Sequence, residues 1–224
     1  MTLRLYIPAV LLMAAAVGAA QPDSVQVTRD FQFTDGVYLA FEDFQANRPS
    51  LSWDEVDAQL VTSRQAFMAQ AEYIRKKDGS FLPSDSIWGI CLKGTPYILL
   101  PDTATSKQVM VFAGLRVRGR ICYYTYEAEE SRTIEMAAYN PLTGRPFRKG
   151  AISREETVVR KRMLHFQDGR REVFSKEAFL DWITDDPQLW RTVDELSDKE
   201  AEEKLYKCLL IYDDRNPAYV PVKN

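Results

Sequence analysis

Arginine at every second position of one segment is the arrangement in this sequence most suited to binding chemistry: Arg116, Arg118 and Arg120. Side chains of a β-strand alternate between its two faces, so a regular strand projects all three guanidinium groups from one face. Such a row can hold a carboxylate or sulfate group through paired hydrogen bonds. Tyr124 and Tyr126 follow with the same parity and could add an aromatic platform for a sugar ring. The alternative is a solvated outer sheet face, whose arginines pair with glutamates of a neighbouring strand.

Paired carboxylates occur four times: Glu127 with Glu129, Glu155 with Glu156, Asp185 with Asp186, and Asp213 with Asp214. Hydrolysis of a glycosidic bond uses two carboxylates that face each other across a cleft at roughly 5 to 9 Å. Two of the pairs have a structural explanation, because Asp186 precedes a proline as a helix cap and Asp213 lies at the end of a predicted helix. A hydrolase with a carboxylate pair is therefore the alternative function.

His165 is the single histidine, so a Ser-His-Asp triad or a Cys-His dyad would have to use it. The sequence has no Gly-x-Ser-x-Gly elbow and no Cys-x-x-Cys pair for zinc. It also has no glycine-rich phosphate loop before a helix. We predict no catalytic residue, no metal site and no cofactor.

The three cysteines are Cys91, Cys122 and Cys208. Free cysteine is among the most buried residue types, so all three fit as small buried apolar residues. In an oxidising compartment one pair could form a disulfide. The alternative is therefore a Cys91–Cys122 disulfide, which requires that their strands be neighbours.

The first twenty residues have the pattern of an export signal peptide. Arg4 supplies the positive charge, residues 5–17 are apolar, and Gly18-Ala19-Ala20 offers small residues for cleavage before Gln21. The apolar run is shorter than the about 20 residues that span a bilayer, and no second long apolar segment follows. We predict a soluble mature protein, residues 21–224, that is periplasmic or secreted and has no transmembrane segment.

Composition is that of a folded globular protein, with 46% hydrophobic and 27% charged residues. The charge balance is 29 − 32 = −3. Because no domain-scale basic excess exists, we predict no nucleic-acid partner. The length fits one folded domain.

Apolar runs rich in β-branched and aromatic residues make residues 87–129 the predicted centre of a sheet. We predict an α+β fold: an antiparallel β-meander that can curl towards a barrel or sandwich, with a short N-terminal helix at residues 41–47. Residues of one parity in this segment are expected to face the core: Val109, Val111, Ala113, Leu115, Val117, Ile121 and Tyr123. The pattern is mainly β over residues 21–174 and helical over residues 175–217.

Residues 53–83 fit two structures. Ser52 and Glu55 have capping-box spacing, which favours a helix beginning at Trp53. A hairpin around Asp78-Gly79 competes with that helix. Further along, turn residues predict two more hairpins, one pairing residues 134–139 with 146–152 and one pairing 157–166 with 171–174. Helix caps are predicted at Ser175, Asp186 and Ser197.

Several short motifs carry a resemblance to a known group: residues 36–44 with Arg48-Pro49-Ser50, residues 87–91 with Pro96-Tyr97-Ile98, residues 118–122, and residues 212–217. In that order they resemble a family of uncharacterised exported proteins of Bacteroidota. The resemblance spans most of the mature chain. It implies an exported bacterial protein, and it brings no activity or catalytic residues with it.

Export, the lack of a catalytic constellation and the arginine and tyrosine face together favour one function. We predict a non-enzymatic binding protein of the cell envelope, whose partner is an envelope protein or a glycan. The alternatives are the carboxylate-pair hydrolase and a carrier that holds a small ligand inside a curled sheet.

Overall fold

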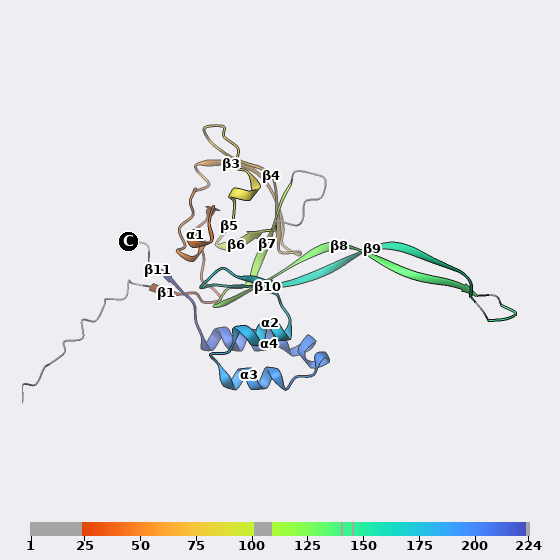
Figure 1. The fold of residues 1–224 in the computed structure, drawn as a ribbon. Helices are drawn as coiled ribbons and strands as arrows, with labels where there is room; N and C mark the ends of the chain where they lie inside the picture. The colour runs from red at the N-terminus through yellow and green to blue at the C-terminus, as the bar shows by residue number, and fades with distance from the viewer. Residues whose placement is uncertain (1–23, 101–108, 140, 145, 223–224) are drawn as a thin grey trace, which may run out of the picture.

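The computed structural model describes residues 24–100, 109–139, 141–144 and 146–222. Its fold is α+β, with antiparallel sheets, one of which is strongly curled into a half-barrel. The predicted fold class is therefore confirmed. Figure 1 shows a curled β body, a helical layer below it and a long two-stranded arm that projects from the body. The predicted leader, residues 1–20, lies outside the described residues.

The curled sheet contains these strands: β2 (Gly36–Tyr38), β3 (Val56–Ser63), β4 (Met68–Lys76), β5 (Gly89–Leu92), β6 (Thr95–Leu99), β7 (Met110–Val117), β8 (Ile121–Tyr139), β9 (Pro146–His165) and β10 (Arg171–Val173). Their order is β10-β9-β8-β7-β6-β5-β2, with β4 also on β7 and β3 on β4. A second sheet joins β1 (Ser24–Gln26) to β11 (Tyr219–Pro221). The predicted antiparallel meander is seen in the run from β5 to β10.

The inner core fills the concave side of the curled sheet, because its side chains come from β2 and from β5 to β9. Phe44 of the short helix α1 (Phe41–Gln45) is fully buried in it. Its ring stacks on Phe33 and Trp88, with centroids 4.8 and 4.6 Å away. The helix predicted at residues 41–47 is therefore confirmed, and its role is to close the open side of the curl.

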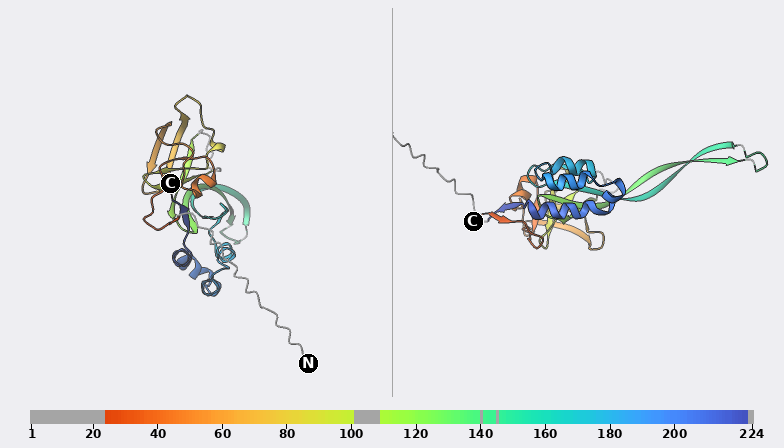
Figure 2. Two further views of the ribbon diagram at one scale, coloured as in Figure 1. Left: turned by 90° about the vertical axis from the view of Figure 1, so that its left-hand side faces the viewer. Right: turned by 90° about the horizontal axis from the view of Figure 1, so that it is seen from below.

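Three helices cover the outer face where β8 and β9 leave the body: α2 (Lys176–Trp182), α3 (Pro187–Asp194) and α4 (Asp198–Arg215). The right-hand view of Figure 2 shows them lying across the sheet. The three predicted caps are confirmed, because Ser175, Asp186 and Ser197 each accept a hydrogen bond from the first turn of their helix. Among the described helices, none combines the length and apolar character that a membrane crossing needs.

Strand β7 is buried on both faces, apart from Arg116. Val111, Ala113 and Leu115 belong to the inner core, as their parity predicts. Side chains of the opposite parity are buried too, because the β3–β4 hairpin packs over them in a third core that includes Met110 and Phe112. The prediction of which residues face the inner core is thus confirmed for β7 as far as Leu115. It is wrong for Val117, Ile121 and Tyr123, which face the helical layer instead.

The helix predicted to begin at Trp53 is wrong, because residues 56–76 form the β3–β4 hairpin. In β4, Gln59 pairs with Tyr73 and Leu60 with Ala71, so one extra residue, Glu72, bulges out. The bulge places the buried side chains of Ala71 and Ile74 three positions apart in the sequence, which is a spacing typical of a helix. The competing hairpin around Asp78-Gly79 is present, since the Lys76 N–H donates to the Ser80 carbonyl at 2.8 Å.

Candidate functional site

Two of the three arginines of the predicted binding face are tied to the body by backbone carbonyls. Arg116 donates from Nη2 to the Ala66 carbonyl (3.1 Å) and from Nε to Thr125 Oγ1 (2.9 Å). Arg118 donates from Nη1 to the Phe31 carbonyl (2.8 Å). Burial lowers the pKa of Arg118. Both guanidinium groups therefore hold separate segments of the chain in place.

Arg118 and Arg120 both lie beyond the end of β7, so the three arginines do not share one regular strand. β7 ends at Val117, and its register against β8 shifts between Leu115 and Val117. The alternation of faces therefore does not continue to position 120. Arg120 Nη2 instead lies 3.0 Å from Asp185 Oδ2 in the helical layer. The prediction of one shared arginine face is wrong.

The two tyrosines of that face lie on β8. Tyr124 is 3% exposed and belongs to the inner core. Tyr126 packs against it, with ring centroids 6.4 Å apart and an interplanar angle of 18°, and stays partly exposed. Of the five predicted binding residues, Tyr126 is therefore the one placed on the projecting arm with a partly open ring.

Asp213 of α4 anchors the turn between β7 and β8. Its Oδ1 accepts a hydrogen bond from the Ile121 N–H (2.9 Å), whereas Oδ2 is buried without a hydrogen-bond partner among the described residues. Burial raises the pKa of Asp213 to about 7, although the backbone N–H groups of Ile121 and Arg120 act in the opposite direction. A Cβ at Gly119 would overlap this carboxyl group. The site therefore requires glycine at position 119 and acts as a contact between the turn and α4.

All three cysteines are free and buried. Cys91 lies on β5 and Cys122 on β8, and these strands are not neighbours in the sheet. The three cysteines therefore fit the expectation of buried apolar residues, and the alternative, a Cys91–Cys122 disulfide, is not formed. Burial raises the pKa of the Cys122 thiol to about 12 and also raises that of Cys91 and Cys208. Protonated thiols are poor nucleophiles, so the cysteines act as buried apolar residues.

His165 is buried at the end of β9. Its Nδ1 lies 3.0 Å from Asp168 Oδ1, and its ring meets Trp182 edge-on at 5.4 Å. Within the described residues, no hydrogen bond joins this side chain to a serine or cysteine. The arrangement fixes the β9–β10 turn against α2 rather than forming a triad.

The acidic pairs have different surroundings. Glu127 and Glu129 are exposed and project from the same face of β8. Glu155 and Glu156 project from opposite faces of the same strand. Asp186 caps α3, and the Leu189 N–H lowers the pKa of its carboxyl group. The described part of the chain holds no group of three or more metal-binding side chains.

Two of the hollows on the body are lined by described residues with both polar and apolar side chains. One, of about 360 Å³, lies between α1 and β11, and Glu42 is the acidic residue among those that line it. The other, of about 290 Å³, lies between α2 and α4 and is lined by both acidic and basic side chains, including Glu177, Glu202 and Lys176. Asp213, whose pKa is raised, lines neither hollow.

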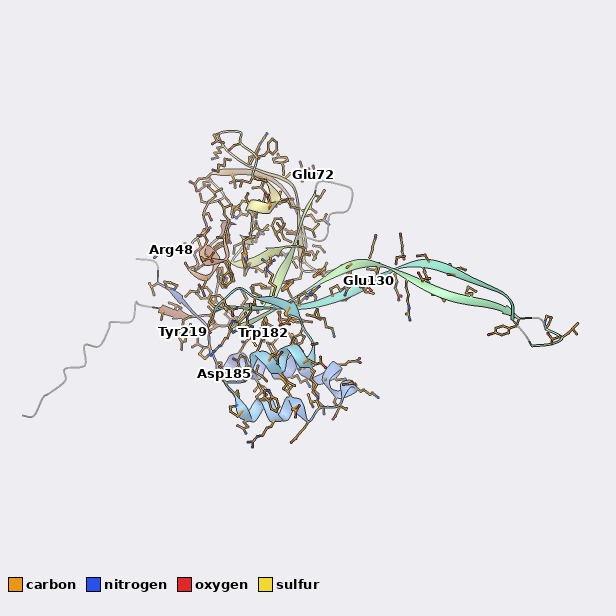
Figure 3. The ribbon with its side chains drawn as sticks, viewed as in Figure 1. Arg48, Glu72, Glu130, Trp182, Asp185 and Tyr219 are labelled. Atoms are coloured by element: carbon orange, nitrogen blue, oxygen red, sulfur yellow. The ribbon has the colours of Figure 1, made fainter. Side chains whose placement is uncertain are left out.

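The most distinctive surface is the arm, residues 125–161. β7 pairs with β8 only up to Tyr124, and β10 pairs with β9 only over residues 162–164. Beyond these points β8 and β9 pair with each other alone. About fifteen residues of each strand, at about 3.3 Å per residue, give an arm about 50 Å long. Figure 3 shows Glu130 on this arm, far from Trp182 and Asp185 beside the helices.

Residues that lie directly opposite each other in β8 and β9 share a face. The even-numbered residues of both strands form what we name the even face: Tyr126, Ala128, Glu130, Arg132, Ile134 and Met136 lie opposite Arg160, Val158, Glu156, Arg154, Ile152 and Gly150. The odd-numbered residues form the odd face: Thr125, Glu127, Glu129, Ser131 and Thr133 lie opposite Lys161, Val159, Thr157, Glu155 and Ser153.

The arm exposes apolar side chains, and none of its described residues is fully buried, although Tyr126 at its base packs against the inner core. On the even face Ile134, Met136 and Ile152 are 42%, 55% and 55% exposed, and Leu142 near the tip is 94% exposed. A lone two-stranded ribbon is at best marginally stable in water, and clustered exposed apolar residues mark binding surfaces. Both outer edges of the arm also present unpaired backbone groups. The arm is therefore the candidate functional site.

Turn residues in the sequence predict paired strands at the outer end of the arm, but they divide the ribbon between two separate hairpins. One feature of the sequence does indicate a single long strand: residues 121 to 139 contain no glycine and no proline. An uninterrupted run of this length indicates one long strand. Nothing in the run itself indicates that most of it has no covering layer.

Comparisons of the chain with models of protein families, with curated proteins and with solved structures found no match.

Proposed function

We propose that this chain is an exported, non-enzymatic binding protein of the cell envelope that holds a protein partner with its arm. One observation carries the proposal: a ribbon about 50 Å long has exposed apolar side chains that no other described part of the chain covers. A partner on the arm would bury Ile134, Met136 and Ile152 and would supply the layer that an isolated ribbon lacks. The partner is a protein rather than a glycan, because the exposed patch is aliphatic.

The positions of the polar residues support a binding role over hydrolysis. Asp213 has the raised pKa expected of a catalytic acid, but its carboxyl group is packed between α4 and the β7–β8 turn and lines neither hollow. A carrier would need an internal cavity, whereas the concave side of the sheet is filled by the inner core. These observations favour the arm as the binding surface of the protein.

Export predicts that the protein isolated from its host begins at Gln21. Mass spectrometry of the intact protein in the periplasmic or secreted fraction measures this directly. The residue before the cut must be small, so Ala20→Tyr is expected to leave the uncut chain with the membrane fraction. A wild-type protein that is found in the cytoplasm with Met1 or Thr2 at its start would contradict export.

The arm is tested by photo-crosslinking in the producing cells. A photoreactive amino acid at Met136 is expected to give one defined protein adduct, since this side chain is exposed on the proposed surface. The matched control is Phe81, an exposed residue of the body at 67% exposure. Adducts of equal yield from both positions would contradict a specific arm surface.

A shortened arm gives a second control. Glu127 lies directly opposite Val159, so residues 128–158 can be replaced by an Asn-Gly turn that closes the hairpin. Because no described arm residue is in the buried core, the shortened protein is expected to unfold at nearly the wild-type temperature. An affinity-tagged form of it should no longer co-purify the partner that crosslinking from Met136 identifies in the full-length chain.

A further inference from the structure

We infer that the even face of the arm binds the even face of a second copy of this chain, with the two arms antiparallel. The inference rests on the proposed function, since it names the partner of the same arm. The order of charges along the even face carries it, because that order becomes complementary to itself when it is reversed.

We call each pair of directly opposed residues, one from β8 and one from β9, a rung. Two neighbouring rungs of the even face each consist of two like charges. Glu130 lies directly opposite Glu156, and Arg132 lies directly opposite Arg154. Like charges in opposed positions destabilise a strand pair. Within the described residues Glu130 forms an ion pair with Arg160, whereas the other three charged groups of these rungs form none. A single arm therefore leaves one acidic and two basic side chains without an oppositely charged partner.

A two-fold axis brings these charges together. The axis would run across the strands, in the plane between two stacked arms, and would pass between the two charged rungs. It would place Glu130 of each copy against Arg132 of the other, and Glu156 of each copy against Arg154 of the other. Four ion pairs would then cross the interface. Such contacts, formed by the same patch on both copies, are the usual basis of homodimers.

The apolar residues beside the charged rungs come into register under the same operation. Ile134 of one copy would face Ala128 of the other, and Ile152 would face Val158. Burying these exposed isoleucines against aliphatic side chains would stabilise the contact. The charged and the apolar positions therefore select the same axis independently.

Other pairings of the arms bring like charges together. In a parallel arrangement the glutamate rungs of the two copies would meet, and so would the arginine rungs. The odd-numbered positions of the paired strands carry four acidic residues, Glu127, Glu129, Glu135 and Glu155, against two basic residues, Lys149 and Lys161. Two odd faces would therefore repel each other, which leaves the even faces in antiparallel order.

The size of the face sets the expected strength. Two strands about 5 Å apart make a ribbon about 10 Å wide, and six rungs extend over about 35 Å, so each copy would bury on the order of 400 Å². The total is below the about 1,200 Å² of the smallest standard protein interfaces. We expect a reversible dimer with a dissociation constant in the micromolar range or above, weakened by salt.

Charge exchange tests the inference. The acidic variant carries Arg132→Glu with Arg154→Glu, and the basic variant carries Glu130→Arg with Glu156→Arg. Sedimentation velocity at low salt and protein concentrations on the order of 100 µM is expected to show dimers of the wild type. Each variant alone is expected to dimerise at least about tenfold more weakly, whereas an equimolar mixture regains a dimer because an acidic face meets a basic one. The odd-face control, Glu129→Arg with Glu155→Arg, is expected to dimerise like the wild type.

A wild type that stays monomeric, or a mixture that fails to dimerise, would overturn the inference. Recovery in the mixture also shows that both variant arms are folded. Crosslinking from Met136 separates this result from the proposed function. An adduct of twice the chain mass supports the dimer. An adduct with a different protein overturns the second-copy inference but leaves the proposed function in place, and the absence of any adduct contradicts both.

Discussion

Replacing Phe44 with alanine is expected to lower the free energy of unfolding by about 3 to 5 kcal/mol, the usual cost of removing a large aromatic side chain from a core. Phe44 has no exposed surface. Its ring stacks on Phe33 and Trp88 and meets Phe166 edge-on, with centroids 5.6 Å apart. Alanine would leave a cavity among these rings, because they are held by separate elements and can collapse only in part. Unfolding in denaturant, followed by tryptophan fluorescence, measures the loss.

Phe81→Ala is the matched control for this substitution. Its side chain is 67% exposed and meets the ring of Tyr73 edge-on. The expected loss is below about 1 kcal/mol, as for most surface substitutions. Similar losses for the two variants would show that Phe44 is not at the centre of the inner core.

Asparagine at position 213 is expected to make the protein more stable than the wild type above neutral pH, by up to about 4 kcal/mol. In the folded chain, burial raises the pKa of Asp213 from 3.8 to about 7. Between these two values the unfolded chain has released a proton that the folded chain keeps, so the free energy of unfolding falls as the pH rises. Below about pH 4 both states are protonated and above about pH 7 both are ionised, so this contribution is then constant.

The difference in unfolding free energy between Asp213→Asn and the wild type isolates this carboxyl group, because the other titrating groups are common to both proteins. Urea unfolding from about pH 4 to about pH 8 should show the difference growing with pH and then levelling off. The amide oxygen can still accept the hydrogen bond from Ile121. Asp181→Asn, at an exposed position of α2, should give a flat difference. A flat profile at position 213 would rule out a buried carboxyl there.

Signals that act within one turn of chain predict the helical layer well. Ser175, Asp186 and Ser197 cap their helices as the sequence indicates, because a cap and its N–H partner are three residues apart. The same kind of signal fails at Trp53. There the spacing of Ala71 and Ile74 arises from a bulge at Glu72, and pairing with β7 decides the structure.

The sequence could not show that the three arginines lie apart, because their positions depend on contacts with residues that are distant in the sequence. Arg120 lies in the turn that follows β7, where side chains no longer alternate between two faces. That turn is held by Asp213, which accepts a hydrogen bond from the Ile121 N–H although the two residues are 92 positions apart in the sequence. The arm presents the converse case. Its alternating residues indicate strands, but whether other strands flank them is decided elsewhere in the sheet, since β7 pairs with β8 only up to Tyr124 and β10 ends at Val173, opposite Arg162.

The small sheet of β1 and β11 determines how the protein responds to a pulling force. Ser24 pairs with Pro221 and Gln26 with Tyr219, so tension applied through the two ends opens this ladder from its outermost rung, one hydrogen-bonded pair at a time. Such peeling needs little force, since the pairs do not share the load. The body, and the arm on the opposite side of it from this sheet in Figure 1, would then stay unstretched until Val27 separates from Ala218.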